Sequence, residues 1–401
     1  MTSSYFSIFR VTGYRWLLGN ALASSAAWTV EGLAQGWLVL TLTDSPFWLG
    51  VVVGVRGVSQ TVCSILGGPL VDRLDRRKLL IVNNALASLL ALGLAGLVLS
   101  DSARVWHVLL FVLAGGAIGA LNGPSFNALT YDVVGPQRLL QGAAFRFMSG
   151  GLVRVFAALA GGYIIGLLGI GQSYVVVAAA YLLGAASLLP VRADRRPAEA
   201  KESPLRSLMA GVSYAFGTPP VRSLLFLSLM TEFFGFSYQY MKPVIARDAL
   251  QVGAVGLGYL EAASALGSVA AMVGVSALGD FRRKGWLLLG GAFGFGLGIA
   301  LFGLSPWYAL SLPLAALVGG SGAVYDSTMS TVTQMTASAA MRGRVLGLYV
   351  ATWGTNQLAG FGLGALGSVI GVPLALAMSG TVVAANAVRL LPKAGRLGAK
   401  T

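Results

Sequence analysis

Four acidic residues lie inside long apolar stretches of this sequence, where a charged side chain is unfavourable. They are Glu31, Glu232, Glu261 and Asp326. On insertion scales, a charge at the centre of a lipid bilayer costs about 2.5–3.5 kcal/mol. Carboxylates kept at such depth face the protein interior or a water-filled cavity, where they can bind and release protons. We therefore expect these residues to couple to protons or to line a substrate cavity.

Basic residues reach a similar depth. Arg56, Arg146 and Arg154 lie within apolar stretches, and Glu31 lies about 16 positions, or roughly 24 Å of helix, into its own stretch. Arg56 and Arg154 are expected near that level, so either could stabilise the charged form of Glu31 in one state of a cycle. The alternative is a static buried ion pair that only fixes helix packing.

Aromatic side chains surround Glu232 in the sequence TEFFGFSYQY at 231–240. These rings could stack on an amphipathic or cationic ligand. They could equally fill a membrane span or form an interfacial belt. Polar residues inside other stretches, such as Asn356, suit helix–helix contacts as well as they suit a ligand. Acidic groups with aromatics favour a cation and the arginines favour an anion, so the sign of the ligand stays open.

The composition determines the environment of these residues. Hydrophobic residues make up 56% of the 401 positions and charged residues only 10%, against about 25% in soluble domains. The 55 glycines suit close packing of membrane helices. The net charge of +14 comes from short loops between apolar runs, which does not indicate nucleic-acid binding. A single cysteine, Cys63, excludes an intramolecular disulfide and a cysteine-based metal site.

Turn-forming residues divide the chain into twelve apolar segments, each long enough to cross a membrane. The expected spans are 16–42, 47–72, 79–100, 105–131, 139–168, 170–190, 221–245, 252–279, 285–304, 307–335, 342–368 and 370–391. We expect an N-terminal six-helix bundle at 1–190, a cytoplasmic linker at 191–220 and a C-terminal six-helix bundle at 221–401. No cleaved signal peptide is expected.

The loop charges predict the orientation. Of the 28 Lys and Arg residues, 22 fall on one side of the predicted spans, three fall on the other side and three lie within spans. Lys and Arg concentrate on the cytoplasmic side of membrane proteins. Both termini are therefore expected in the cytoplasm.

One basic loop and a looser echo mark the two halves. GGPLVDRLDRRKLL stands at 67–80, and ALGDFRRKGWLLL returns at 277–289. The first loop resembles the signature between spans 2 and 3 of the major facilitator superfamily, with Asp75 where that signature often has glycine. The elements 341–346 and 122–127 resemble those of bacterial exporters akin to the enterobactin exporter and macrolide efflux pumps. The segment 150–162 lacks the proline that many such exporters carry.

This resemblance implies an all-α polytopic membrane protein of twelve helices in two pseudo-symmetric bundles. Such a protein works as a monomer by alternating access around a cavity near the midplane. The resemblance also implies a gate in the loops, and we expect Asp132 to pair with Arg138 there. The expected gating residues are Gly68, Asp72, Arg73, Arg76, Arg77, Asp132, Arg138, Arg342 and Arg344.

The sequence contains no phosphate-binding loop, no HExxH and no GxSxG motif, so neither ATP-driven transport nor an enzyme is indicated. We expect a secondary transporter of a bacterial inner membrane, with no cofactor or metal. It would export a hydrophobic or amphipathic small molecule, drug-like or siderophore-like, by proton antiport. Its partners are that substrate, protons and membrane lipids. The alternatives are uptake of a solute or lipid by symport or facilitated diffusion, and a non-transporting scaffold or sensor.

Overall fold

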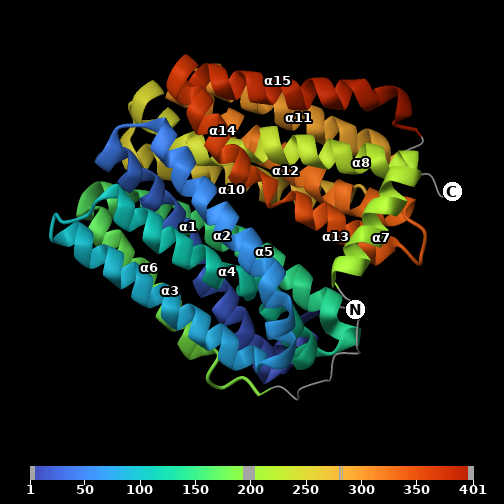
Figure 1. Ribbon diagram of the computed structural model, residues 1–401, viewed down its shortest axis with the longest axis horizontal. Coiled ribbons are helices and arrows are strands. Elements are labelled where there is room, and N and C mark those ends of the chain that lie inside the picture. The colour runs from blue at the N-terminus through green and yellow to red at the C-terminus, as the bar shows by residue number, and fades with distance from the viewer. Residues whose placement is uncertain (1–4, 193–203, 280, 282, 396–401) are drawn as a thin grey trace. The chain divides into compact units, whose positions relative to one another are not determined.

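The computed structural model describes residues 5–192, 204–279, 281 and 283–395, and all regular elements among them are helical (Figure 1). Contacts divide the chain into two compact units. The first unit comprises Met1–Asp44, Val55–Ala198 and Gly253–Ala262, and the second comprises Ser45–Gly54, Glu199–Val252 and Ala263–Thr401. The predicted bundle boundaries, 190/191 and 220/221, remain predictions.

Most of the first unit consists of six long helices, which the chain enters through a short 3₁₀ turn. They are α1 (Thr12–Thr43), α2 (Pro46–Arg73), α3 (Arg76–Leu99), α4 (Val105–Val134), α5 (Leu139–Tyr163, continued by the π turn Ile164–Leu168) and α6 (Ile170–Ser187). Leu17, Leu80, Leu129 and Leu188 form a buried core where α1, α3, α4 and α6 meet.

The second unit contains both continuous and broken helices. They are α7 (Pro204–Gly217), α8 (Pro219–Met230), α9 (Lys242–Val244), α10 (Gly253–Ala277), α11 (Lys284–Leu304), α12 (Tyr308–Thr336), α13 (Arg342–Thr352), α14 (Thr355–Ile370) and α15 (Val372–Leu390). Short π and 3₁₀ turns join α8 to α9 and continue past it to Ala249. The π-helical turn Thr231–Gly235, which follows α8, and the break between α13 and α14 become important below.

The predicted turns lie where the helices end. Asp44, Gly135, Gly169 and Gly371 adopt positive φ angles of 50°, 73°, 103° and 86°. Glycine adopts this region without the steric penalty of a Cβ atom, which explains its use at three of these ends. At the start of α3, the Asp75 carboxylate accepts hydrogen bonds from two backbone N–H groups and caps the helix.

Within the described part of the chain, nine helices are long and apolar enough to cross a membrane. They are α2–α6, α10–α12 and α15. The other three predicted spans correspond to the 32-residue α1 and to the broken segments 219–249 and 342–370. The prediction of an all-α polytopic fold is confirmed, and the helices are consistent with twelve spans.

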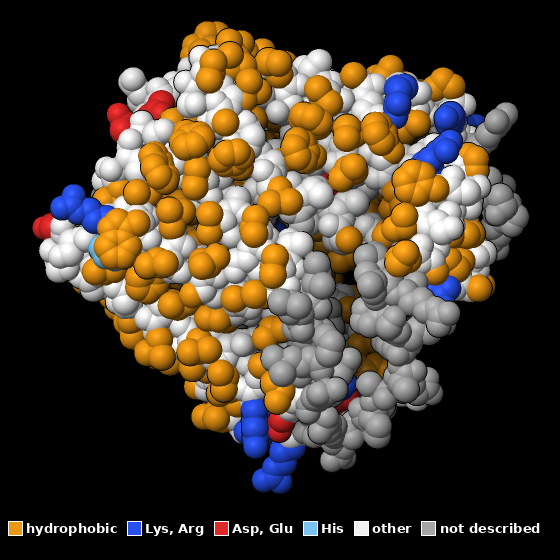
Figure 2. Space-filling model, viewed as in Figure 1, with side chains coloured by type: hydrophobic (Ala, Val, Ile, Leu, Met, Phe, Trp, Pro, Cys, Tyr) orange, Lys and Arg blue, Asp and Glu red, His pale blue; other side chains and the backbone are white. Residues whose placement is uncertain are grey.

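The molecular surface is apolar over a large area. Hydrophobic side chains are spread over the described part of the face seen in Figure 2, and few charged side chains lie among them. Leu167, Trp307 and Val369 are 75%, 70% and 82% exposed. Soluble proteins rarely expose such extensive apolar surface, whereas lipid tails solvate it without penalty. The surface therefore agrees with the membrane setting predicted from composition.

Glycine permits close helix packing in the second unit. A Cβ atom on Gly296 of α11 would lie 2.5 Å from the carbonyl oxygen of Gly380 on α15. The two backbones can approach only because neither residue has a side chain, which is the arrangement expected where lipid supplies no hydrophobic drive for association.

Helix α7 was not predicted, because the segment 191–220 was interpreted as a linker. Ala215 of α7 is buried with Val221, Ala337 and Val345, so this helix packs on the second unit. Residues 193–203 of the predicted linker lie outside the described residues.

Candidate functional site

In the first unit, Glu31 lies in a network that joins three helices. One Glu31 carboxylate oxygen is 3.4 Å from an Arg56 guanidinium nitrogen, and the other accepts a 2.6 Å hydrogen bond from the Tyr181 hydroxyl. Arg56 also donates to Gln35 at 3.1 Å. The Glu31 and Arg56 side chains are each 22% exposed. A guanidinium and a hydroxyl donor thus contact the two oxygens of one carboxyl group.

Arg154 does not join this network. It is exposed on α5 and makes no ion pair with a described residue. Arg146, about two turns closer to the start of α5, lies over the Phe126 ring at 4.6 Å and donates to Asn127 at 3.3 Å. Of the two arginines expected near Glu31, the structure places Arg56 beside it, whereas Arg154 faces elsewhere.

In the second unit, Glu232 is 3% exposed and lies in the π-helical turn that follows α8. Its carboxylate accepts a 3.2 Å hydrogen bond from the Asn356 side-chain amide. The Asn356 oxygen in turn accepts one from the Tyr240 hydroxyl at 3.1 Å. Asn356 stands at the start of α14, immediately after the break that separates it from α13. Two interrupted helices therefore meet at this carboxyl group, and π turns often occur at functional positions.

Asp326 lies on α12 and accepts a hydrogen bond from the Tyr349 hydroxyl of α13. Tyr349 is 1% exposed. Within the described residues, neither Asp326 nor Glu232 forms an ion pair with Lys or Arg. The two units therefore differ, because Glu31 has a cationic partner and these two carboxylates have neutral ones.

The predicted aromatic surface beside Glu232 is largely part of the core. Phe236 and Tyr238 pack against Phe295, with ring centroids 4.7 and 5.9 Å apart. Tyr238 is 6% exposed, and the Lys242 ammonium lies 5.0 Å from its ring. Phe233 is 37% exposed. Tyr238 thus belongs to the protein interior rather than to an interfacial belt.

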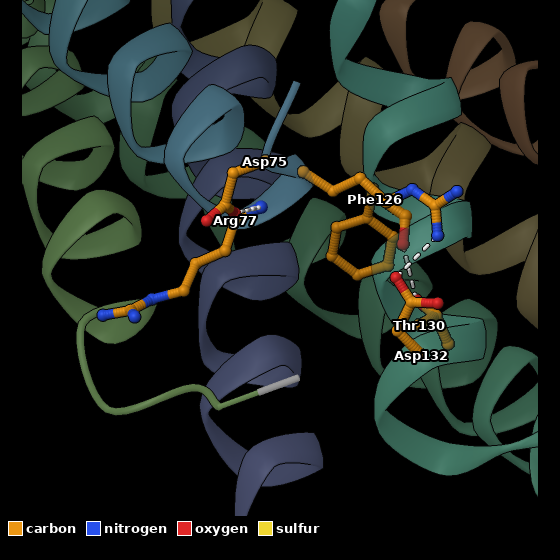
Figure 3. A network of polar contacts seen from close by, with 6 residues as sticks. Asp75, Arg77, Phe126, Thr130 and Asp132 are labelled. Carbon is orange, nitrogen blue, oxygen red and sulfur yellow. Dashed lines mark hydrogen bonds and ion pairs between the residues drawn. The ribbon is translucent and has the colours of Figure 1, made fainter. Parts of the chain in front are cut away.

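The loop between α2 and α3 is anchored to the first unit by ion pairing and backbone contacts. Arg76 lies 2.6 Å from Asp132 of α4, whose side chain is 3% exposed. Figure 3 shows this carboxylate between α3 and α4, with Thr130 bonded to the Phe126 carbonyl beside it. Arg77 donates to the Leu188 carbonyl oxygen at 2.9 Å.

These contacts correct one prediction. Asp132 pairs with Arg76 and not with Arg138, because α3 runs beside α4 while Arg138 projects from the exposed turn before α5. Three further predicted gating residues lie where the surroundings of the side chains are not described. They are Gly68, Asp72 and Arg73.

The second unit has a cavity of about 580 Å³ near the ends of α7, α12 and α13. Arg342 and Tyr214 line it. Arg342 donates to the Gln334 carbonyl oxygen at 2.9 Å, and Arg344 lies 3.4 Å from the Met341 sulfur. The Ser338 backbone N–H donates to the Tyr214 hydroxyl and lowers the pKa of Tyr214, since it stabilises the phenolate.

Glu261 lies half-buried on α10, in the part of that helix grouped with the first unit. Among the residues with described positions, no group of three or more His, Cys, Asp or Glu side chains could hold a metal ion. Sequence reasoning did not identify the two hydroxyl partners, Tyr181 and Tyr349. A tyrosine within an apolar helix gives a weak signal for such a role, because its ring also suits a core.

Residues 3–395 match the family described as transmembrane secretion effectors. The chain belongs to this family of major facilitator transporters. It is 29% identical over 341 residues to the enterobactin exporter EntS of Escherichia coli O139:H28 (strain E24377A / ETEC), covering 84% of this chain and 81% of that protein. The same values hold for EntS of Shigella boydii serotype 18 (strain CDC 3083-94 / BS512).

Solved structures show the same fold. A bacterial homologue of the human lysosomal transporter Spinster aligns with a TM-score of 0.72 and 16% identity, covering 97% of this chain and 96% of that one. The nucleoside transporter NupG aligns with a TM-score of 0.73 and 13% identity, covering 95% and 98%. The resemblance found in the loop signature is therefore confirmed. The protein is an integral membrane transporter of the major facilitator type.

Proposed function

We propose that this transporter exports a siderophore-like small molecule from a bacterial cell in exchange for protons. The observation that carries the coupling is the pair of carboxyl groups in the second unit, Glu232 and Asp326, which have neutral partners within the described residues. The relationship to the enterobactin exporters favours export and suggests the class of substrate.

The physical argument rests on the energy of a buried charge. A carboxylate held in a low-dielectric interior without a cation is unfavourable, so the group is suited to carry a proton while dry. Water entering from one face stabilises the charge and releases that proton. Glu232 is 3% exposed, and interrupted helices surround it. Rearrangement at such breaks can expose or cover the carboxyl group without unfolding a continuous helix.

Glu31 has a different part in this proposal. Its ion pair with Arg56 and its bond from Tyr181 join α1, α2 and α6. Of the two predicted roles for Glu31, the geometry favours the static ion pair over the titrating group. Proton coupling is thereby assigned to the second unit.

We further propose that the predicted loop residues act as a gate on the cytoplasmic side of a bacterial inner membrane, with both termini in the cytoplasm. The Arg76–Asp132 ion pair would hold the loop before α3 in the first unit. The bond from Arg342 to the Gln334 carbonyl oxygen would hold the loop before α13 in the second unit. The basic loops support this orientation through the positive-inside rule. We propose a monomer as the working form.

The test is complementation in an Escherichia coli strain that lacks EntS. Expression of this chain should restore enterobactin in the culture medium, and dissipating the proton gradient should abolish the effect. Accumulation of enterobactin inside the cell would instead support the uptake alternative. No change in either compartment, with the protein present in the membrane, would exclude enterobactin and return the scaffold alternative to consideration.

A further inference from the structure

Three arginines recur at regular intervals along α5. Arg138 immediately precedes the helix, and Arg146 and Arg154 follow at steps of eight residues. Eight residues advance an α-helix by about 12 Å and rotate it by about 80° beyond two full turns. Arg146 and Arg154 therefore share one side of the helix and form a basic stripe into the predicted membrane span.

The opposite side of α5 is apolar. Met148, Leu152 and Phe156 are 63%, 50% and 69% exposed. At 100° per residue Met148 and Leu152 point away from both arginines, whereas Phe156 lies about 160° from Arg154 and about 80° from Arg146. This side suits lipid tails, whereas a guanidinium in hydrocarbon is strongly unfavourable. The Arg146 contacts with Phe126 and Asn127 also direct the basic stripe toward α4 and not outward.

The charges of this stripe are not neutralised by the acidic groups nearby. Glu31 is already paired with Arg56, and Asp132 with Arg76. Across the residues whose positions are given, neither Arg146 nor Arg154 has a carboxylate within ion-pair distance. Among the described residues, Arg146 contacts the Phe126 ring and the Asn127 amide oxygen and interacts electrostatically with Tyr14. The side chains therefore retain free N–H donors and positive charge.

We infer that the transported molecule is an organic anion and that Arg146 and Arg154 bind its acidic groups. Guanidinium groups pair with carboxylates, sulfonates and phosphates through paired N–H donors, which gives both charge and geometric selectivity. The inference rests on the proposed transport function and specifies its substrate class. The sequence alone left the sign of the substrate's charge open. In the first unit Glu31 and Asp132 already have cationic partners, whereas Arg146 and Arg154 form no ion pair with a described residue, which favours an anionic substrate.

The first experiment measures the electrostatic potential at the stripe without any substrate. Gly150 lies between the two arginines, about 6 Å along the helix from each, and a Cβ atom there would meet no other atom within 4 Å. Gly150→Cys is introduced after Cys63, the single native cysteine, is replaced by alanine. Labelling rates are measured with a negatively charged sulfonatoethyl and a positively charged trimethylammonium-ethyl methanethiosulfonate reagent. Each rate is divided by that of free 2-mercaptoethanol.

We expect the negative reagent to be favoured by about tenfold or more, since two positive charges act at short range. Arg146→Gln with Arg154→Gln should remove this preference, and the matched Arg146→Lys with Arg154→Lys should retain most of it. No reaction with either reagent would show that the stripe does not face water and would overturn the inference. A preference unchanged by the glutamine substitutions would overturn it as well.

The second experiment concerns the ligand. Carboxyfluorescein and rhodamine 6G share a xanthene ring system and differ in charge. Carboxyfluorescein should slow labelling of Gly150→Cys by neutral N-ethylmaleimide, and rhodamine 6G should not. Protection by rhodamine 6G alone, or by neither dye, contradicts the anionic assignment. Because both experiments measure labelling of purified protein and require no transport, a failure of the enterobactin secretion test would be distinguishable from a failure of this inference.

Discussion

The ion pair between Glu31 and Arg56 allows a quantitative test of how the first unit is stabilised. Arg56→Gln removes the cation and leaves a carboxylate that is only 22% exposed. Glu31→Gln removes the anion instead, and the double substitution removes both charges while keeping side chains of similar size. If the pair is a structural link between α1 and α2, the two single substitutions should each destabilise the protein. The double variant should then be close to the native protein.

The distance sets the scale of the effect. Two unit charges 3.4 Å apart attract by about 5 kcal/mol at an effective dielectric constant of about 20. Desolvation and the 22% exposure of both side chains reduce the net value, so we expect a coupling energy of about 2 kcal/mol. Arg56→Gln should be the more damaging single substitution, since Glu31 then retains only its bond from Tyr181.

Thermal unfolding in detergent, followed by the fluorescence of the eight tryptophans, measures this cycle. Because the double variant is expected near native, the two single losses should sum to about 2 kcal/mol; at about 2–4 °C per kcal/mol, Arg56→Gln, the larger of them, should lower the midpoint by roughly 2–6 °C. The double variant should recover most of that loss. Strict additivity of the two single effects would refute the reasoning, because independent residues show no coupling energy.

Three further outcomes follow from the described contacts. Arg76→Gln should lower the free energy of unfolding by about 3–5 kcal/mol, because it leaves the buried Asp132 carboxylate without its cation. Arg138→Gln, on the exposed turn, should have little effect on the free energy of unfolding. Gly296→Ala should reduce the yield of folded protein, and Gly290→Ala, whose added methyl meets no atom within 4 Å, should be tolerated; equal yields would contradict the close packing of α11. Subtracting the ultraviolet titration of Tyr214→Phe from that of the native protein should reveal one phenol that ionises below the ordinary pKa of tyrosine. The hydrogen bond from the Ser338 N–H to Tyr214 should strengthen as the pH rises through the pKa of Tyr214.

The long helices could be predicted from the sequence because their ends have local causes. Asp44, Gly135, Gly169 and Gly371 end or separate helices through their own backbone preferences, so neighbouring residues sufficed to place them. The approach of Arg56 to Glu31 was also predictable, since both residues lie at a similar depth in consecutive antiparallel spans. The depth of a residue in the membrane follows from the number of residues between it and the end of its span.

The remaining contacts depend on which way a helix faces, and counting does not provide this. Arg154 lies at the expected depth, but it projects from a side of α5 that does not face Glu31 of α1. Asp132 pairs with Arg76, 56 positions earlier, because packing places α3 beside α4. The π-helical turn at Glu232 ends at Gly235, but a single glycine does not distinguish a π turn from a continuous helix. Its partner Asn356 is 124 positions away.

The proposal that the second unit carries the proton is tested most directly in proteoliposomes with an imposed pH gradient. Addition of enterobactin should dissipate the gradient, followed by an internal pH-sensitive dye, and Glu232→Gln or Asp326→Asn should abolish this substrate-dependent proton flux. The protein with both Glu31→Gln and Arg56→Gln should retain the flux. It lacks the Glu31–Arg56 ion pair, and neither residue is left as an unpaired charge. Native flux in the Glu232 and Asp326 variants, with loss in the doubly neutral protein, would place the proton in the first unit and contradict the account.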